Sequence, residues 1–313
     1  MTHRVIVVRT PNPYSLEMAT TTISFGEELR RWRDARRMSQ LALAGDAEVS
    51  QRHLSFLETG KSKPSREMVL HLGRALDLSL REQNALLASA GFSPEYTETG
   101  LDDPDLDEVR HVLEVVLAAH GHIPAYVVDR GWDLILANPA SLGIAALAGL
   151  DPPLDVATNV MRTCFHPDGL RSRVLDWERF ATTVLHRLER EVVDRPFDDR
   201  LADLLAEART YPGVADLAVR DPLPTGNDLM VPLLLASEHG TLRFVSTIAT
   251  IGAPFDVTLE ELRIETLLPA DRLTEAAMRH AVAATDDASG MIERVDGFPW
   301  ASDRFGPGFP ANG

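Results

Sequence analysis

Residues 39–60 contain two short segments with helical apolar periodicity, separated by a tight polar turn. Ser39 and Ser50 each precede one segment, where a serine hydroxyl can accept hydrogen bonds from the free N–H groups of a helix start. Small and branched apolar residues predict the buried sides of the two helices: Leu43, Ala44, Val49, Leu54 and Leu57. The pattern predicts a helix-turn-helix, which restricts the surrounding chain to a compact bundle of short helices.

The second predicted helix leaves Gln51, Arg52 and Ser55 on its exposed side. Arginine pairs with guanine, glutamine with adenine, and serine with either, when such side chains reach base edges in the major groove. Exposed residues at the start of such a helix have little structural purpose. We therefore expect these residues to contact bases or phosphates.

The flanking sequence completes an all-α domain of five helices. Residues 25–37 carry an apolar stripe at helical spacing and a basic opposite side, and two further helices are expected from Arg66 and over residues 80–90. Gly60 ends the second helix of the motif, where a left-handed residue is favoured. The arginines at 30–37 contact phosphates or form a solvated face, since acidic neighbours offer them intrahelical partners.

Net charge divides unevenly along the chain, which carries −16 in total. Residues 1–92 have 13 Lys and Arg against 10 Asp and Glu, whereas the remainder has 18 against 37. Phosphate binding depends on charge within a Debye length of about 8 Å, so the local excess is what matters. The acidic remainder repels DNA non-specifically and can sharpen selectivity.

The helical domain resembles the Xre, or lambda-repressor-like, helix-turn-helix family. The resemblance rests on Ser39-Gln40, on Leu57-Glu58-Thr59-Gly60 and on Pro64-Ser65. It implies a phosphate contact from Gln40, groove contacts from Ser50, Gln51 and Arg52, and backbone contacts from Lys61 and Lys63. Glu48 stands where the family usually has glycine, so it either takes a positive φ or shifts the turn by one residue.

Composition divides the chain into five parts. These are an unstructured leader at 1–22, the helix-turn-helix domain at 23–92, a linker at 93–105, a second domain at 106–285, and a Gly- and Pro-rich tail at 286–313. The second domain is predicted as α+β, with two paired strands at 124–129 and 132–137 and a helix capped by Asn138. Further helices are expected at 156–165, 171–193 and 199–209, and further strands at 228–235, 241–250 and 258–267.

The second domain resembles the MmyB-like ligand-binding domain, a PAS-like sensor. The resemblance is carried by residues 124–130 with Trp132 and Asn138, and by a second block of Asn159, Arg162, Phe165, Arg171, Asp176 and Trp177. It implies a cavity for an apolar, fatty-acid-like small molecule. The ligand-binding residues that we expect are Trp132, Asn138, Asn159, Arg162, Phe165 and Trp177.

Each of these residues also has a structural interpretation. The aromatic side chains either line a cavity or form ordinary core. Arg162 either clamps a ligand carboxylate or forms an ion pair, for which Asp176 is the candidate partner.

Other chemistry has weak support in the sequence. No His or Cys spacing typical of zinc is present, so no metal is expected, and no cofactor is implied. Cys164 lacks the signals of a nucleophile or a redox sensor. A single cysteine and the absence of a 20-residue apolar run favour a cytoplasmic protein.

These observations predict a homodimeric DNA-binding transcription regulator that is controlled by an apolar small molecule. The alternative is a ligand-independent regulator whose second domain only dimerises or contacts a protein such as RNA polymerase. An enzyme fused to a DNA-binding domain would need convergent titratable groups, and the sequence signals none.

Overall fold

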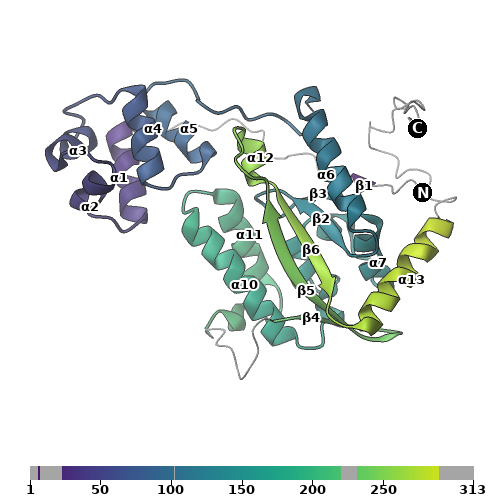
Figure 1. Cartoon of the computed structure of the whole chain (residues 1–313). Coiled ribbons are helices and arrows are strands. Elements are labelled where there is room, and N and C mark those ends of the chain that lie inside the picture. The colour runs from purple at the N-terminus through teal and green to yellow at the C-terminus, as the bar shows by residue number, and fades with distance from the viewer. Residues whose placement is uncertain (1–5, 8–22, 102, 220–230, 289–313) are drawn as a thin grey trace, which may run out of the picture.

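The computed structural model describes residues 6–7, 23–101, 103–219 and 231–288. Five helices form an N-terminal head, and an extended segment connects the head to a larger α+β domain (Figure 1). Most of the predicted leader and nearly all of the predicted tail lie outside the described residues. Within the described part of the chain, every helix is too short or too polar to cross a bilayer.

The head helices all start at a serine. They are α1 (Phe25–Ala35), α2 (Gln40–Asp46), α3 (Gln51–Glu58), α4 (Arg66–Ala75) and α5 (Leu80–Ser89). In each case the serine hydroxyl accepts a hydrogen bond from the backbone three residues on, and α1 and α5 also have a capping-box glutamate. The predicted caps Ser39 and Ser50 and the predicted all-α class are confirmed.

The turn of the helix-turn-helix contains the predicted backbone strain. Glu48 adopts φ 49°, and its N–H donates to the carbonyl of Gly45. Gly60 adopts φ 69° after α3, as expected for a helix end. Glu48 therefore adopts a positive φ at the position where the family usually has glycine, and the turn is not shifted by a residue.

The second domain contains the following elements. They are η1 (Pro104–Leu106), α6 (Asp107–Ala119), β2 (Ala125–Val128), β3 (Leu134–Ala137), α7 (Pro139–Leu147), α8 (Leu154–Ala157), α9 (Val160–Phe165), η2 (Leu170–Arg173), α10 (Trp177–Asp194), α11 (Asp199–Thr210), η3 (Ala215–Val219), β4 (Leu233–Ser237), β5 (Gly240–Thr250), α12 (Val257–Glu261), β6 (Arg263–Pro269) and α13 (Arg272–Ala288). With β1 (Ile6–Val7), the strands form one antiparallel sheet in the order β1-β3-β2-β6-β5-β4.

The two faces of this sheet pack against different helices. Leu113 and Leu117 of α6 cover the face that carries Val127. The opposite face packs against α7 and α13 at one end, where Phe244 is fully buried, and against α9, α10 and α11 at the other. The predicted α+β class is confirmed.

Several predicted elements differ from the structure. The predicted helix 171–193 is two elements, η2 and α10, and the predicted helix 156–165 divides into α8 and α9. The predicted strand 258–267 was wrong over its first half, because Asp256 accepts the N–H groups of Thr258 and Leu259 and so caps α12. Ile6 and Val7, within the predicted unstructured leader, pair with β3.

The head contacts the α+β domain through Phe197, at the corner between α10 and α11. The Phe197 ring packs edge-on against Trp32, with ring centroids 4.6 Å apart, and it is a partly buried side chain at the edge of the head's hydrophobic cluster. The Arg31 guanidinium carbon lies 3.4 Å from the centroid of the same ring. Arg36 donates to the carbonyl of Asp194 at 2.7 Å. A side chain of the other domain therefore packs against the core of the head.

A second contact joins α12 to α5 and to the predicted linker. Glu260 accepts the N–H of Leu80 at the start of α5 at 2.8 Å. Glu261 pairs with Arg81 at 2.7 Å. The linker residues Thr97 and Thr99 both donate to the Asp256 carboxylate. The linker is thus attached to the second domain.

Gly26 of α1 is where the head packs most tightly against α3. A Cβ atom at this position would lie 2.5 Å from the carbonyl oxygen of Glu58 and 2.7 Å from that of Leu57. We expect Gly26→Ala to lower the free energy of unfolding of the head by about 1–3 kcal/mol, because the backbones of α1 and α3 must separate. Urea unfolding followed by circular dichroism measures this change.

Gly45 of α2 provides the matched control. A Cβ atom there meets nothing within 4 Å. Alanine is the better helix former, so Gly45→Ala should leave the stability unchanged or raise it by up to about 1 kcal/mol. Equal destabilisation by both substitutions would contradict the packing described.

Candidate functional sites

The N-terminal part of α3 presents polar side chains to solvent. Gln51 and Arg52 are exposed, and Ser55, one turn on, is partly exposed. Ser50 precedes them, with its hydroxyl accepting the N–H of His53 at 3.1 Å. Leu54 and Leu57 hold the opposite side of α3 in the core at 0% exposure. This arrangement suits a helix that enters a DNA groove.

Phe56 organises the cations at the other end of this surface. The Arg52 guanidinium lies 5.2 Å, and the Lys61 ammonium 5.8 Å, from the centroid of the half-buried Phe56 ring. Such contacts hold cations over an aromatic face at little cost. Lys61 and Lys63 are both exposed in the loop after α3. The Phe56 ring thus contacts one cation of the helix and one of the following loop.

Gln40 has a partner inside the head. Its side-chain amide donates to Glu58 at 2.8 Å, and Arg33 donates to the same carboxylate at 2.6 Å through Nε and 3.2 Å through Nη2. The Glu58 carboxylate raises the pKa of Arg33 further above its usual value. The hydrogen bond to Glu58 therefore orients the Gln40 side chain at the start of α2.

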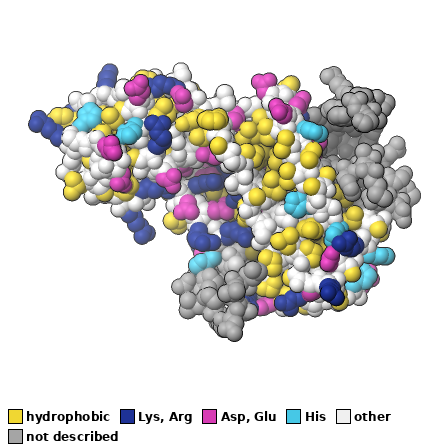
Figure 2. Space-filling model, viewed as in Figure 1, with side chains coloured by type: hydrophobic (Ala, Val, Ile, Leu, Met, Phe, Trp, Pro, Cys, Tyr) yellow, Lys and Arg dark blue, Asp and Glu magenta, His cyan; other side chains and the backbone are white. Residues whose placement is uncertain are grey.

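Charged side chains cover two regions of the head. Figure 2 shows Lys and Arg side chains projecting from its outer margin, on the side of α3, and acidic and basic side chains together where the head faces the second domain.

Much of the arginine run at 30–37 has partners within the protein. Arg33 binds Glu58, Arg31 covers Phe197 and Arg36 binds Asp194. Arg52, Lys61 and Lys63, by contrast, are exposed.

Asn138 and Asn159 are buried helix caps in the second domain. The Asn138 oxygen accepts the N–H groups of Ala125 and Ser141, and its amide donates to Ile123. The Asn159 oxygen accepts the N–H groups of Met161 and Arg162, and its amide donates to the Gly131 carbonyl and to Asp133. The hydrogen bonds of both side chains therefore hold the start of a helix against the neighbouring strand or turn.

Trp132 and Arg162 also have protein partners. Trp132 is fully buried, with φ 65°, and its indole N–H donates to Glu191 at 3.0 Å. Arg162 forms a two-bond ion pair with Glu207, with both contacts at 2.8 Å, and this pair lowers the pKa of Glu207. The predicted ion-pair partner Asp176 was wrong, because α11 brings Glu207 to Arg162.

Phe165 and Trp177 lie together between two core clusters. Their rings meet edge-on at 6.3 Å, and Phe165 is fully buried. Trp177 and Phe180 pack against both the cluster beneath α11 and the cluster beneath α7. The Arg171 guanidinium carbon lies 4.8 Å from the Trp177 ring centroid.

A buried polar network that the sequence did not predict lies on the face of the sheet opposite α6. Glu265 is 4% exposed and accepts hydrogen bonds from Tyr126 at 2.9 Å, Arg187 at 3.3 Å and Ser246. Burial raises the pKa of Tyr126 well above its usual value. The alternation in β6 was the only available signal, since it places Glu265 on the same face as Leu267.

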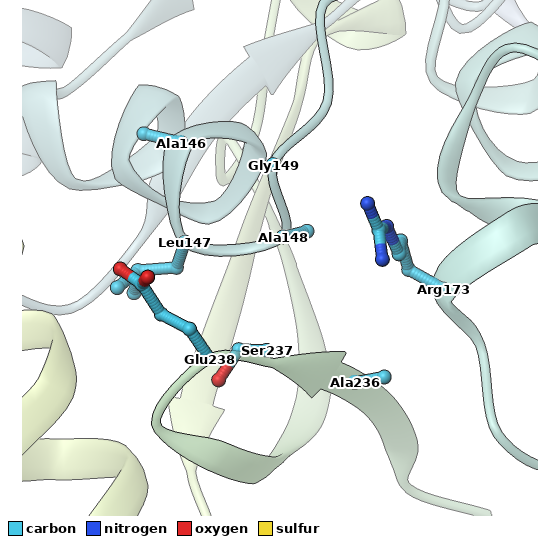
Figure 3. Close-up of a pocket in the computed structure, with 8 residues that line it drawn as sticks. All are labelled: Ala146, Leu147, Ala148, Gly149, Arg173, Ala236, Ser237 and Glu238. Atoms are coloured by element: carbon cyan, nitrogen blue, oxygen red, sulfur yellow. The ribbon is translucent and has the colours of Figure 1, made fainter.

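The open hollows of the second domain lie elsewhere. The larger has a volume of about 470 Å³ and is lined by the end of α7, Arg173 and the turn after β4. Figure 3 shows Arg173 reaching across it towards Gly149, with Glu238 beneath Leu147. None of the predicted ligand-binding residues lines it. Among the described residues no three His, Cys, Asp or Glu side chains converge as a metal site.

The exposed surface of α3 and the attached α+β domain define a class, the helix-turn-helix transcription regulators with a C-terminal ligand-binding domain. Comparison with family models agrees on both parts. A helix-turn-helix domain model matches residues 24–86, and the MmyB-like transcription regulator ligand binding domain matches residues 109–281. The chain therefore belongs to the MmyB-like transcription regulators. These families are regulatory and not enzymatic. No curated protein matched the chain.

Cys164 lies in the core of the second domain at 8% exposure. Burial, with a smaller effect of Glu265, raises the pKa of its thiol to about 12. Because only the thiolate reacts, we expect the folded protein to react with Ellman's reagent at pH 8 roughly a thousandfold more slowly than a free thiol. The thiol should react stoichiometrically in 8 M urea. Rapid modification of the folded protein would contradict this burial.

Proposed function

We propose that this transcription regulator reads its operator through Ser50, Gln51, Arg52 and Ser55. Gln40, Lys61 and Lys63 bind the DNA backbone on either side. The observation that carries the proposal is that Gln51 and Arg52 are exposed on a helix whose opposite side is fully buried. Neither of them has a carboxylate partner among the described ion pairs. A DNA-binding regulator acts where the chromosome lies, so we expect a cytoplasmic protein.

We propose further that the protein binds DNA as a two-fold homodimer. One helix-turn-helix head buries too little surface to select a single site in a genome. Two heads related by a two-fold axis would read half-sites roughly 34 Å, or one helical turn, apart. The second domain supplies much of the dimer interface in this proposal.

The ligand in this proposal is an apolar, fatty-acid-like molecule that binds in the second domain. The contact of Phe197 with Trp32 supports control of the head by that ligand. Both α10 and α11, which flank Phe197, pack against the cluster that contains Phe165. A ligand that moves these helices therefore moves a residue of the head core. A coupling free energy on the order of 1–3 kcal/mol is typical of such control.

The tight packing of the second domain favours a second candidate function. Trp132 and Phe165 are buried in a core cluster, and Trp177 packs against that cluster and a second one. None of the six predicted ligand-binding residues lines either of the two hollows described above. A regulator of this kind would be ligand-independent, with a second domain that only dimerises or contacts a protein such as RNA polymerase. Mass spectrometry of molecules released from the purified protein separates the two: a stoichiometric small molecule favours the sensor, and an empty protein that stays empty in lipid extract favours the second candidate.

Arg52→Ala tests the DNA interface. Operator duplexes enriched from a random library with the wild-type protein provide the site. If Arg52 contacts a guanine, the substitution should weaken binding to that operator by about 1–3 kcal/mol and relax the preference at one base pair. Fluorescence anisotropy at fixed salt measures both effects.

Arg190→Ala is the control for the loss of one positive charge. Arg190 is exposed on α10 of the second domain, away from α3. This variant should bind the operator as the wild type does. An unchanged operator affinity in Arg52→Ala would remove Arg52 from the interface.

A further inference from the structure

The ring of Phe56 lies on the outer side of α3 and not in the core of the head. Phe56 follows Arg52 by four residues, which places the two side chains on one side of the helix. Leu54 and Leu57, by contrast, are fully buried. Among the described residues, the side chains that form the head's hydrophobic cluster or pack against it do not include Phe56. The ring is therefore left for a purpose other than core packing.

The position of the ring is fixed where α3 ends and the following loop begins. The Phe56 carbonyl accepts the N–H groups of Lys61 at 2.8 Å and Ser62 at 3.1 Å, and Gly60 turns the chain between them with φ 69°. The Arg52 guanidinium and the Lys61 ammonium lie 5.2 Å and 5.8 Å from the ring centroid. The free protein therefore holds an apolar ring in contact with two exposed cations.

The location of α3 leaves this ring open to a large partner. Figure 1 shows α3 at the end of the head farthest from the second domain. The contacts between the two domains lie instead at the other helices, with Phe197 on Trp32 of α1 and Glu261 on Arg81 of α5. A duplex that approaches α3 therefore meets the ring together with Arg52.

An apolar ring on such a helix matches one feature of the major groove. Thymine presents its C5-methyl group there, and phenylalanine is one of the side chains that contact this methyl. The other base-edge groups used for recognition in the groove are hydrogen-bond donors and acceptors, with which a phenyl ring cannot pair. The chemistry of the ring therefore selects thymine, whereas the cations beside it suit guanine and phosphates.

We propose that Phe56 recognises a thymine of the operator through its C5-methyl group. This inference rests on the proposed DNA binding by α3, and it adds an apolar base contact to the polar ones of Gln51, Arg52 and Ser55. Stacked base pairs are about 3.4 Å apart, and the Arg52 guanidinium carbon is 5.2 Å from the ring centroid. The thymine should therefore lie one or two base pairs from the guanine assigned to Arg52.

Replacement of single thymines by deoxyuridine tests the assignment, because deoxyuridine lacks only the C5-methyl group and keeps the base pair. The full-length protein is titrated by fluorescence anisotropy at fixed salt with the operator enriched from a random library. At one thymine of a half-site, deoxyuridine should weaken wild-type binding about 3- to 10-fold, as expected for the loss of one buried methyl contact. Phe56→Gln should bind the two duplexes equally.

Phe255→Gln is the matched control, because Phe255 is 82% exposed in the loop before α12 of the second domain. This variant should keep the wild-type preference for thymine. Phe56→Leu, which retains an apolar side chain, should keep part of it. The preference is the ratio of two affinities measured on one protein sample, so a partly unfolded variant loses affinity for both duplexes and retains the ratio.

The outcomes separate this inference from the proposed function. Equal binding of the wild type to all the deoxyuridine duplexes and to the thymine operator would overturn the methyl contact and leave the ring as a support for the cations. A preference that survives Phe56→Gln would assign the methyl contact to another residue, with operator reading by α3 intact. Failure to enrich any operator would contradict the proposed function, and this inference with it.

The position of the thymine provides a further check. The base pair at which Arg52→Ala relaxes the preference should lie within two steps of the thymine whose methyl group Phe56 contacts. A larger separation would contradict the shared position of the two side chains on α3.

Discussion

The contact of Phe197 with Trp32 is the interaction on which the joint action of the two domains depends. Phe197 comes from the α10–α11 corner, yet it packs against the core of the head, and the Arg31 guanidinium lies over its ring. The Trp32 indole N–H beside it is buried and has no hydrogen-bond partner in the described part of the chain. The contact thus combines apolar packing with a buried donor that the described residues leave unsatisfied, which is unfavourable.

Arginine illustrates how the same residue type serves opposite purposes in this chain. Arg33 and Arg162 each bind a carboxylate through two hydrogen bonds, and they hold helices together. Arg52 is exposed on α3. Arg171 is partly buried, and its inaccessible Nη1 has no hydrogen-bond partner among the described residues. An arginine that lacks a carboxylate from its own chain is available to an anion from outside. The sequence around an arginine does not show whether it has a carboxylate partner, because those carboxylates come from distant segments of the chain.

Local patterns predicted much of the fold. Serine caps, apolar spacing and Gly60 defined the head. Of the two outcomes expected at Glu48, the structure has the positive φ and not the shifted turn. The contacts of Arg162 and Phe197 were not predictable, because Glu207 and Trp32 are 45 and 165 residues away along the chain. Asn138 and Asn159 were read as ligand contacts, but their hydrogen bonds are used within the fold. Sequence spacing predicts helices and strands better than it predicts tertiary partners.

Hydrogen exchange of the full-length protein with Phe197→Ala tests the central claim most directly. If the α10–α11 corner completes the core of the head, the substitution should speed amide exchange in α1 (Phe25–Ala35) and at the start of α5 (Leu80–Ser89). Amide exchange in β2, and in α6 on the sheet face away from α10 and α11, should stay as in the wild type. Unchanged exchange in α1 would mean that the head folds independently of the second domain, and would contradict the account.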